Sequence, residues 1–154
     1  VARHMSAQMG CYSVTQDFSY TNPSERKLFK NIEPETRAGT AEDDAKIRQT
    51  IEYLHLRLLG EEIDDIELEA TFELFEEAAD FIATSGLSAQ DRVASSCRSR
   101  NDYFVTENAQ GVSVGPPLDT VEGRRQIISD TSGAIGGWSA VMTYLLSDYR
   151  FLYE

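Results

Sequence analysis

Apolar side chains recur at steps of three and four near the end of the chain, which is the spacing of a helix with one buried stripe. The stripe consists of Ile135, Trp138, Met142, Leu145, Tyr149 and Leu152. Asp130, Thr131 or Ser132 is placed to cap the start of this helix. Gly136 and Gly137 each lower helix propensity by about 1 kcal/mol relative to alanine, so we expect another backbone to approach closely here.

A second helix is predicted over residues 41–59. Thr40 provides an N-cap hydroxyl, Asp43 follows three residues later, and Gly60 provides a left-handed stop. Between these signals the apolar residues repeat at helical spacing, at Ile47, Ile51, Leu54 and Leu58. The pattern is typical of an amphipathic helix packed on a core.

A third helix is predicted to begin at Asp64 and Asp65 and to end at Gly86. Its buried stripe is Leu68, Phe72, Phe75, Ala79 and Ile82. Because the link to the preceding helix is short, we expect the two helices to form an antiparallel helical hairpin. Weaker signals suggest a shorter helix over 88–97, a helical turn over 121–128 and a short helix over 25–30 within an otherwise irregular segment, 6–39.

These elements predict an all-α fold, a small helical bundle closed by a terminal amphipathic helix. With 154 residues the chain fits one domain, which we place at 40–154 after the irregular segment 6–39. Residues 1–5 resemble a cloning remnant that ends in a His-Met pair. A removed export signal is compatible with this interpretation, whereas a native start at Met5 would favour a cytoplasmic protein.

Charge narrows the range of partners. The chain has 14 basic and 26 acidic side chains and a net charge of −12. Nucleic acid is therefore a poor partner, because each phosphate contact requires a cation. A membrane span is also not expected, since no run approaches the roughly 20 apolar residues that a bilayer requires. A protein partner or a neighbouring domain fits better.

Cys11 and Cys97 are the two cysteines, and neither lies in a CxxC or CxxCH motif. They either form a disulfide in an oxidising compartment or remain two unrelated thiols. A redox motif, a cysteine-rich zinc site and covalent c-type haem attachment are all disfavoured.

Glu52 and His55 form the Glu-x-x-His step that carboxylate-bridged di-iron bundles use. A metal role would also need carboxylates such as Glu73 or Glu76, because the only other histidine is His4. The alternative is a histidine beside the apolar stripe that bonds to a neighbour. No cofactor is predicted, and a bound metal ion is the alternative hypothesis.

The runs 54–67 and 74–78 resemble a helical segment of large exported planctomycete and myxobacterial proteins, which reads approximately Arg-Ala-Phe-Arg-Arg-Pro-Leu-Thr-x-x-Glu and then Leu-Phe-x-x-Ala. In that family a following module closes with Leu-x-Ser-Pro-x-Phe-Leu-Tyr, which residues 146–154 resemble. This chain has Leu58-Leu59-Gly60 in place of Arg-Arg-Pro, and Asp148 in place of the last proline. The resemblance implies a periplasmic or extracellular module that often accompanies cytochrome-c-like domains, and it supplies no catalytic residue.

Two functions follow as hypotheses. The first is a non-enzymatic structural or protein-docking helical module of an exported bacterial protein. The terminal helix is rich in aromatic side chains, Trp138 and Tyr144 among them. We expect most of these side chains in the core and some of them on a docking face for another domain. The second is a small metal-binding helical-bundle enzyme centred on Glu52 and His55.

Overall fold

The computed structural model describes residues 2–102, 106–107, 110 and 113–148. In this part of the chain the α-helices are α1 (Ala2–Phe18), α2 (Ala41–Leu59), α3 (Asp65–Ala83) and α4 (Ala134–Leu146), with short 3-10 helices at Pro23–Glu25, Ser95–Cys97 and Leu118–Thr120. Strands β1 (Thr106–Glu107) and β2 (Ser113–Val114) form an antiparallel ladder. The all-α class is confirmed. None of the described helices combines the length and the apolar character that a bilayer crossing requires.

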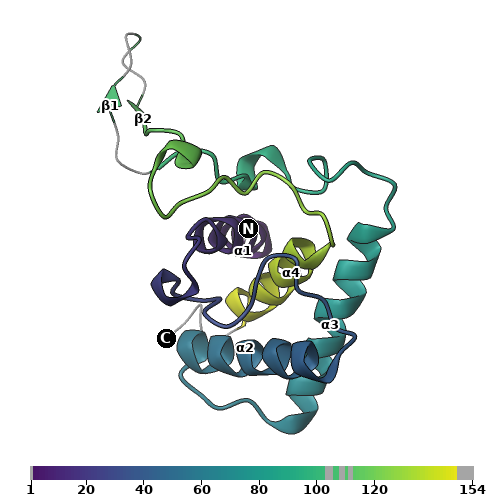
Figure 1. Cartoon of the computed structure of the whole chain (residues 1–154). Helices are drawn as coiled ribbons and strands as arrows, with labels where there is room; N and C mark the ends of the chain where they lie inside the picture. The colour runs from purple at the N-terminus through teal and green to yellow at the C-terminus, as the bar shows by residue number, and fades with distance from the viewer. Residues whose placement is uncertain (1, 103–105, 108–109, 111–112, 149–154) are drawn as a thin grey trace.

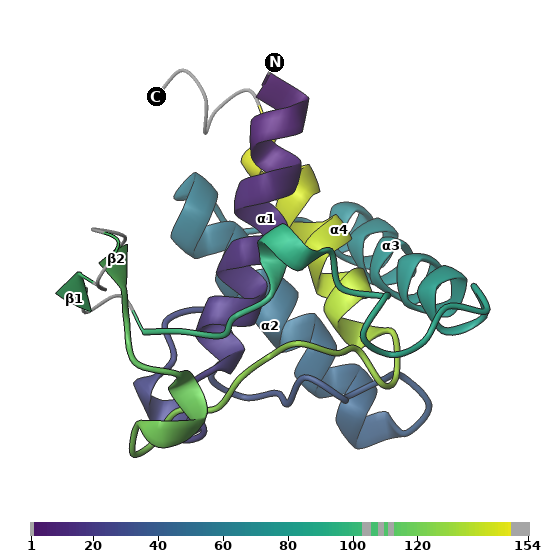
Figure 2. The ribbon, with the colours of Figure 1, turned by 90° about the horizontal axis from the view of Figure 1, so that it is seen from above.

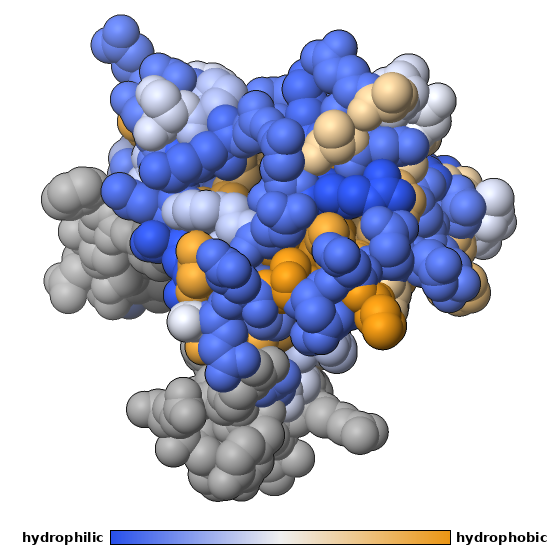
Figure 3. All heavy atoms as spheres, turned by 90° about the horizontal axis from the view of Figure 1, so that it is seen from below, coloured by the Kyte–Doolittle hydropathy of each residue, from blue (hydrophilic) through white to orange (hydrophobic). Residues whose placement is uncertain are grey.

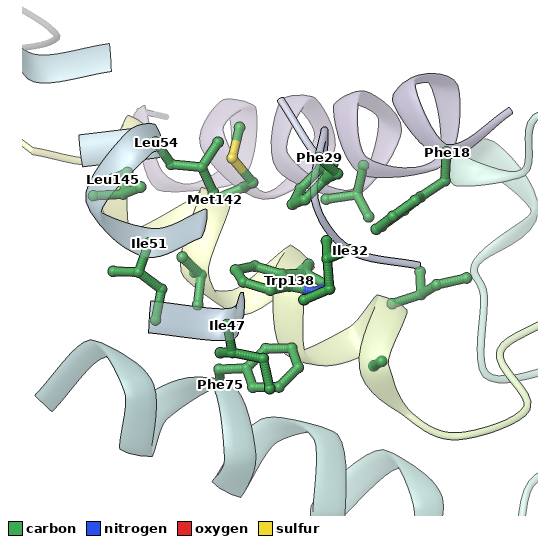
Figure 4. Close-up of a cluster of buried hydrophobic side chains, with 14 of the residues drawn as sticks. Phe18, Phe29, Ile32, Ile47, Ile51, Leu54, Phe75, Trp138, Met142 and Leu145 are labelled. Carbon is green, nitrogen blue, oxygen red and sulfur yellow. The ribbon is translucent and has the colours of Figure 1, made fainter. Parts of the chain in front are cut away.

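Helix α4 is the centre of the fold, with its most extensive contacts to α1 and α3 and smaller ones to α2 (Figures 1 and 2). Trp138 on α4 is fully buried, with its ring centroid 5.2 Å from that of Phe29 and 4.5 Å from that of Phe75. Figure 4 shows this indole between the labelled side chains of the connector after α1 and those of α2 and α3. The predicted stripe is therefore the core over its described part, and Tyr149 and Leu152 lie outside the described residues.

The expected close approach at the glycines is confirmed. A Cβ on Gly137 would lie 2.7 Å from the Phe75 ring and 2.8 Å from the Phe75 backbone oxygen. Gly133 has φ of 86°, and a Cβ there would meet the carbonyl of Ala79. Helix α4 thus begins directly against α3, at a distance that only glycine permits.

The N-cap residue of α4 is Gly133 and not one of the three expected residues, but one of those three, Asp130, bonds the N–H groups at the start of the helix. Its buried carboxylate accepts hydrogen bonds from the backbone N–H groups of Gly133 and Gly136, each at 2.9 Å. Burial raises the pKa of this carboxyl, while the backbone hydrogen bonds and the nearby Arg92 guanidinium oppose the rise. The helix N-terminus therefore supplies the polar partners that a buried aspartate requires.

The bounds of α2 agree with the prediction, and Thr40 Oγ1 accepts the N–H of Asp43 at 3.1 Å. Helix α3 begins after the Asp64 cap as expected, but ends at Ala83, before Gly86. The antiparallel pairing of α2 with α3 is not confirmed. Figure 1 shows α3 rising at a steep angle to α2, and both helices contact α4.

The expectation that residues 6–39 are irregular is wrong for its first part, since α1 extends to Phe18. This helix lacks a regular apolar stripe and has polar residues in the core, including the fully buried Thr15. Its packing on α4 and on the 3-10 helix Ser95–Cys97 decides its conformation, with Val14 and Phe18 fully buried. The cloning-remnant interpretation of residues 1–5 stays a prediction.

Three other expected helical pieces are also wrong. The chain forms a 3-10 turn at Pro23–Glu25 in place of a helix over 25–30, and the stretches 88–97 and 121–128 contain turns and bridges. Arginine side chains hold 88–97 by bonding its carbonyls, as when Arg98 donates to Val93 O at 3.1 Å and to Gln90 O at 2.8 Å. These side-chain bonds take the place of the backbone hydrogen bonds of a helix. The capping residues Ser88 and Asp91 give no sign of them in the sequence.

Hydrogen bonds around the buried side chain of Arg26 order the connector between α1 and α2. The side chain of Arg26 is fully buried and donates to the carbonyls of Tyr20 at 2.9 Å and Ile32 at 2.7 Å, and to the carboxylate of Glu33 at 3.1 Å. Nearby, the carboxylate of Asp17 accepts three backbone N–H groups at 2.7–3.0 Å, from Lys27, Leu28 and Phe29. The connector therefore has little regular secondary structure and is held by these side-chain hydrogen bonds.

Candidate functional site

A groove of 510 Å³ lies between the second half of α2 and the start of α3. We call it the acidic groove. Its lining residues are Gln49, Glu52, Tyr53, Leu56, Glu62, Ile63, Asp65 and Leu68. Local signals build it, because Gly60 ends α2 in the left-handed conformation and the Asp64 cap starts α3 directly afterwards. The loop 60–64 thereby forms one wall, facing the side of α2.

Three carboxylates give the groove its charge. Glu52 projects from α2, Glu62 from the loop and Asp65 from the first turn of α3, and all three are exposed. No ion pair joins any of them to another residue in the described part of the chain. In a chain of net charge −12, this cluster attracts cations and is not neutralised by neighbouring side chains.

Two large apolar side chains are exposed in this region, one of them in the groove. Leu56 lines the groove and is 51% exposed, while Ile66, next to Asp65, is 86% exposed. Figure 3 views the molecule from the side on which α2 lies and shows apolar atoms gathered among hydrophilic ones. A groove that combines an exposed apolar side chain with carboxylates has the composition of a surface that receives an amphipathic partner.

A buried histidine cluster supports the loop wall. His55 is 1% exposed, and its Nδ1 donates to the carbonyl of Glu61 at 2.7 Å, because a carbonyl can only accept. Its Nε2 lies 3.5 Å from a carboxylate oxygen of Glu67, to which the hydroxyl of Tyr144 donates at 2.9 Å. His55 therefore ties the loop to α2, and the Tyr144 bond ties the start of α3 to α4.

The predicted metal ligands differ in their exposure and in their bonding partners. Glu52 is exposed in the groove and His55 is buried beside it, and Glu76 is bonded by Arg37, with 3.2 Å between Nη2 and Oε2. Glu73 is exposed on α3. Among the described residues, no group of three or more His, Cys, Asp and Glu side chains is arranged to hold a metal ion. A metal role for Glu52 and His55 stays a prediction.

The structure joins Cys11 and Cys97 by a disulfide, with 5.6 Å between their Cα atoms. The bond fastens α1 to the 3-10 helix Ser95–Cys97. Thr15 Oγ1 also donates to the carbonyl of Cys97, and Gln16 donates to Ser99 Oγ at 2.8 Å. Three links thus hold α1 to the segment that covers it.

The sequence patterns did not single out the apolar part of the groove. A signal was nevertheless present, because Leu56 lies two residues from the stripe residue Leu54, and Ile66 two residues from Leu68. Two residues correspond to about 200° around a helix, so both side chains must face away from the core. A large apolar residue on the polar side of an amphipathic helix indicates an exposed contact surface.

Comparison with known proteins adds no relative, since no protein-family model, no curated protein and no solved structure matches the chain. The function proposed below is therefore inferred from the geometry of the residues of this chain.

Proposed function

We propose that this chain is a non-enzymatic protein-docking helical module, whose acidic groove binds a basic amphipathic segment of a protein partner or of a neighbouring domain. The observation that carries the proposal is the lining of the groove, in which exposed carboxylates at Glu52, Glu62 and Asp65 border the apolar side chains of Leu56 and Ile63. Acidic side chains select the charge of the partner, and apolar ones supply the burial that stabilises the complex.

The chemistry of the partner follows from this lining. Lysine or arginine side chains would pair with the three carboxylates, and leucine-like side chains on the same face would cover Leu56 and Ile63. A segment of a macromolecule is favoured over a small molecule, because the three carboxylates come from α2, the loop and α3 and so call for several cations on one partner.

We further propose that the protein is exported, to the periplasm or the extracellular space. The Cys11–Cys97 disulfide supports this, since such bonds persist in oxidising compartments and are rare in the cytosol. The resemblance to exported planctomycete and myxobacterial proteins points the same way, with a redox or hydrolytic domain as the neighbouring partner.

Peptide binding tests the docking proposal. The probe is a fluorescein-labelled amphipathic peptide of 14 leucines and lysines in all, with leucine at steps of three and four, measured by fluorescence anisotropy. We expect saturable binding that the double variant Glu52→Gln/Glu62→Gln weakens about fivefold, because two exposed ion pairs at about 0.5 kcal/mol each amount to about 1 kcal/mol. Glu77→Gln is the matched control, since Glu77 is an exposed carboxylate on α3 that does not line the groove.

Two results would contradict the docking proposal. One is an equal effect of the groove variant and Glu77→Gln, which would reveal general charge attraction to an acidic protein. The other is equal binding of a peptide with the same composition in scrambled order, because its leucines would no longer share one face.

The metal-binding bundle is the second candidate, and one observation favours it. Nε2 of the buried His55 has no hydrogen-bond partner among the described residues and lies close to Glu67. Elemental analysis of purified protein tests this candidate. Stoichiometric iron, manganese or zinc that is lost in His55→Ala would support it, whereas a metal-free protein that tolerates this substitution would refute it.

A further inference from the structure

A second hollow, of 310 Å³, lies where the end of α1, the connector after it, α2 and the loop before α4 meet. We call it the cationic pocket. Lys27, Arg57 and Arg124 line it, together with Tyr20, Leu28 and Asp17. These residues come from four segments that are distant in the sequence, and its volume is at the lower end of the range for small-molecule sites.

The charge of this pocket is opposite to that of the chain. Three of the 14 basic side chains line it, although the net charge of the protein is −12. Asp17 is the acidic residue of the lining, but its carboxylate is 7% exposed as a residue and already accepts the backbone N–H groups of Lys27, Leu28 and Phe29. Its hydrogen-bonding capacity is thus largely directed into the protein, whereas the side chains of Lys27 and Arg57 remain exposed and Arg124 is largely buried, with Asp102 and Ser19 as partners.

Arg124 is held in place before any ligand arrives. Its guanidinium carbon lies 3.9 Å from the centroid of the Tyr20 ring, and its Nη2 donates to Ser19 Oγ at 2.7 Å. Asp102 lies 3.5 Å from Nη1. A planar guanidinium fixed on an aromatic ring loses little conformational freedom when it receives an oxyanion.

Lys27 and Arg57 provide the exposed cations. The backbone of Lys27 is fixed on both sides, because its N–H donates to Asp17 at 2.7 Å and its carbonyl accepts the Tyr53 hydroxyl at 2.9 Å. Neither the Lys27 ammonium nor the Arg57 guanidinium forms an ion pair with another residue in the described ranges. Both charges are therefore available to a ligand.

We propose that the cationic pocket binds a small molecule with a phosphate or carboxylate group on an aromatic or aliphatic body. The oxyanion would be bound by Lys27, Arg57 and Arg124, because charge-assisted hydrogen bonds to oxyanions are the strongest that these side chains make. The apolar body would lie against Leu28 and the ring of Tyr20. This ligand class differs from the basic peptide proposed for the acidic groove, so either proposal can fail alone.

The test is a ¹H–¹⁵N NMR titration of the whole chain with phenyl phosphate and, separately, with benzoate, at ionic strength held constant with sodium chloride. We expect saturable shifts at Leu28 and at the Nε–H of Arg124. Lys27→Gln and Arg57→Gln should each weaken binding about tenfold, as expected for a lost hydrogen bond to a charged group. Lys30→Gln, which removes an exposed lysine outside the pocket, should change nothing.

Saturation by either compound supports the proposal, and the tighter of the two identifies the oxyanion. The proposal is overturned if neither compound saturates at millimolar concentration, or if Lys30→Gln weakens binding as much as the pocket variants do. Inorganic phosphate must bind more weakly than phenyl phosphate, because equal affinity would contradict a role for the apolar wall. Unchanged thermal unfolding of the exposed-residue variants would show that any loss is one of binding.

Discussion

Breaking the disulfide between Cys11 and Cys97 should remove a large part of the stability of this fold. The bond closes a loop with a sequence separation of 86 residues. On the chain-entropy model, such a loop restricts the unfolded state by about 4.6 kcal/mol at 25 °C. This value is an upper bound, because residual structure in the unfolded chain already lowers its entropy. Against a typical domain stability of about 5–15 kcal/mol, the loss is a substantial fraction.

The perturbation is the double variant Cys11→Ser/Cys97→Ser, compared with the oxidised protein by urea denaturation. We expect the free energy of unfolding to fall by about 3–5 kcal/mol, and wild type reduced with a dithiol should fall by the same amount. Free-thiol titration in denaturant is the control, and oxidised material should contain no free thiol. The predicted contribution of the disulfide is wrong if the free energies of unfolding of the oxidised protein and the variant agree within about 1 kcal/mol. Two free thiols in oxidised material would contradict the disulfide itself.

Three further predictions concern buried positions. Arg26→Met should lower the free energy of unfolding by about 3–5 kcal/mol, because it leaves the carbonyls of Phe29 and Ile32 without their buried donor at about 1–3 kcal/mol each; a urea-measured loss below about 1 kcal/mol would contradict this. Gly137→Ala should destabilise by about 1–3 kcal/mol despite its better helix propensity, since its Cβ would meet Phe75 at 2.7 Å, and a rise in the melting temperature would disprove the close packing. Burial raises the pKa of Asp130 above its ordinary value of 3.8, so this carboxyl favours folding most below pH 3.8, and its contribution is lost as the pH rises through the pKa of the folded state. In urea titrations at a series of pH values, Asp130→Asn should flatten this decline of the free energy of unfolding. An unchanged pH profile in the variant would contradict the prediction.

The two proposed sites share one helix. The second half of α2 carries Glu52 and Leu56 toward the acidic groove, whereas Arg57 belongs to the cationic pocket. One helix thus presents opposite charges in two directions. A partner segment and a small oxyanion would therefore bind to separate surfaces of the same module, and the matched controls Glu77→Gln and Lys30→Gln separate specific binding from general electrostatics.

Part of the candidate site was predictable from local signals. The ends of α2 and the start of α3 follow from Thr40, Gly60 and Asp64, and these bounds place Glu62 and Asp65 in a short acidic turn. The crossing of α2 and α3 was not predictable, because a short loop limits how far the chain travels but not the angle at which it continues. That crossing decides whether Glu52 and Asp65 share a groove.

Helices α2 and α4 were predictable from the sequence, because their signals lie within the helices themselves and at their ends. The stripe from Ile47 to Leu58 and the stripe around Trp138 each have a helical period, so burial of one face was their only stable outcome. Helix α1 has no such stripe, and only its packing against α4 decided that it would be helical. Tertiary packing also decided that Arg26 is buried and that Lys27, Arg57 and Arg124 line one pocket. The sequence shows the charge of each side chain, but it does not show which distant carbonyl, carboxylate or cation the fold brings next to it.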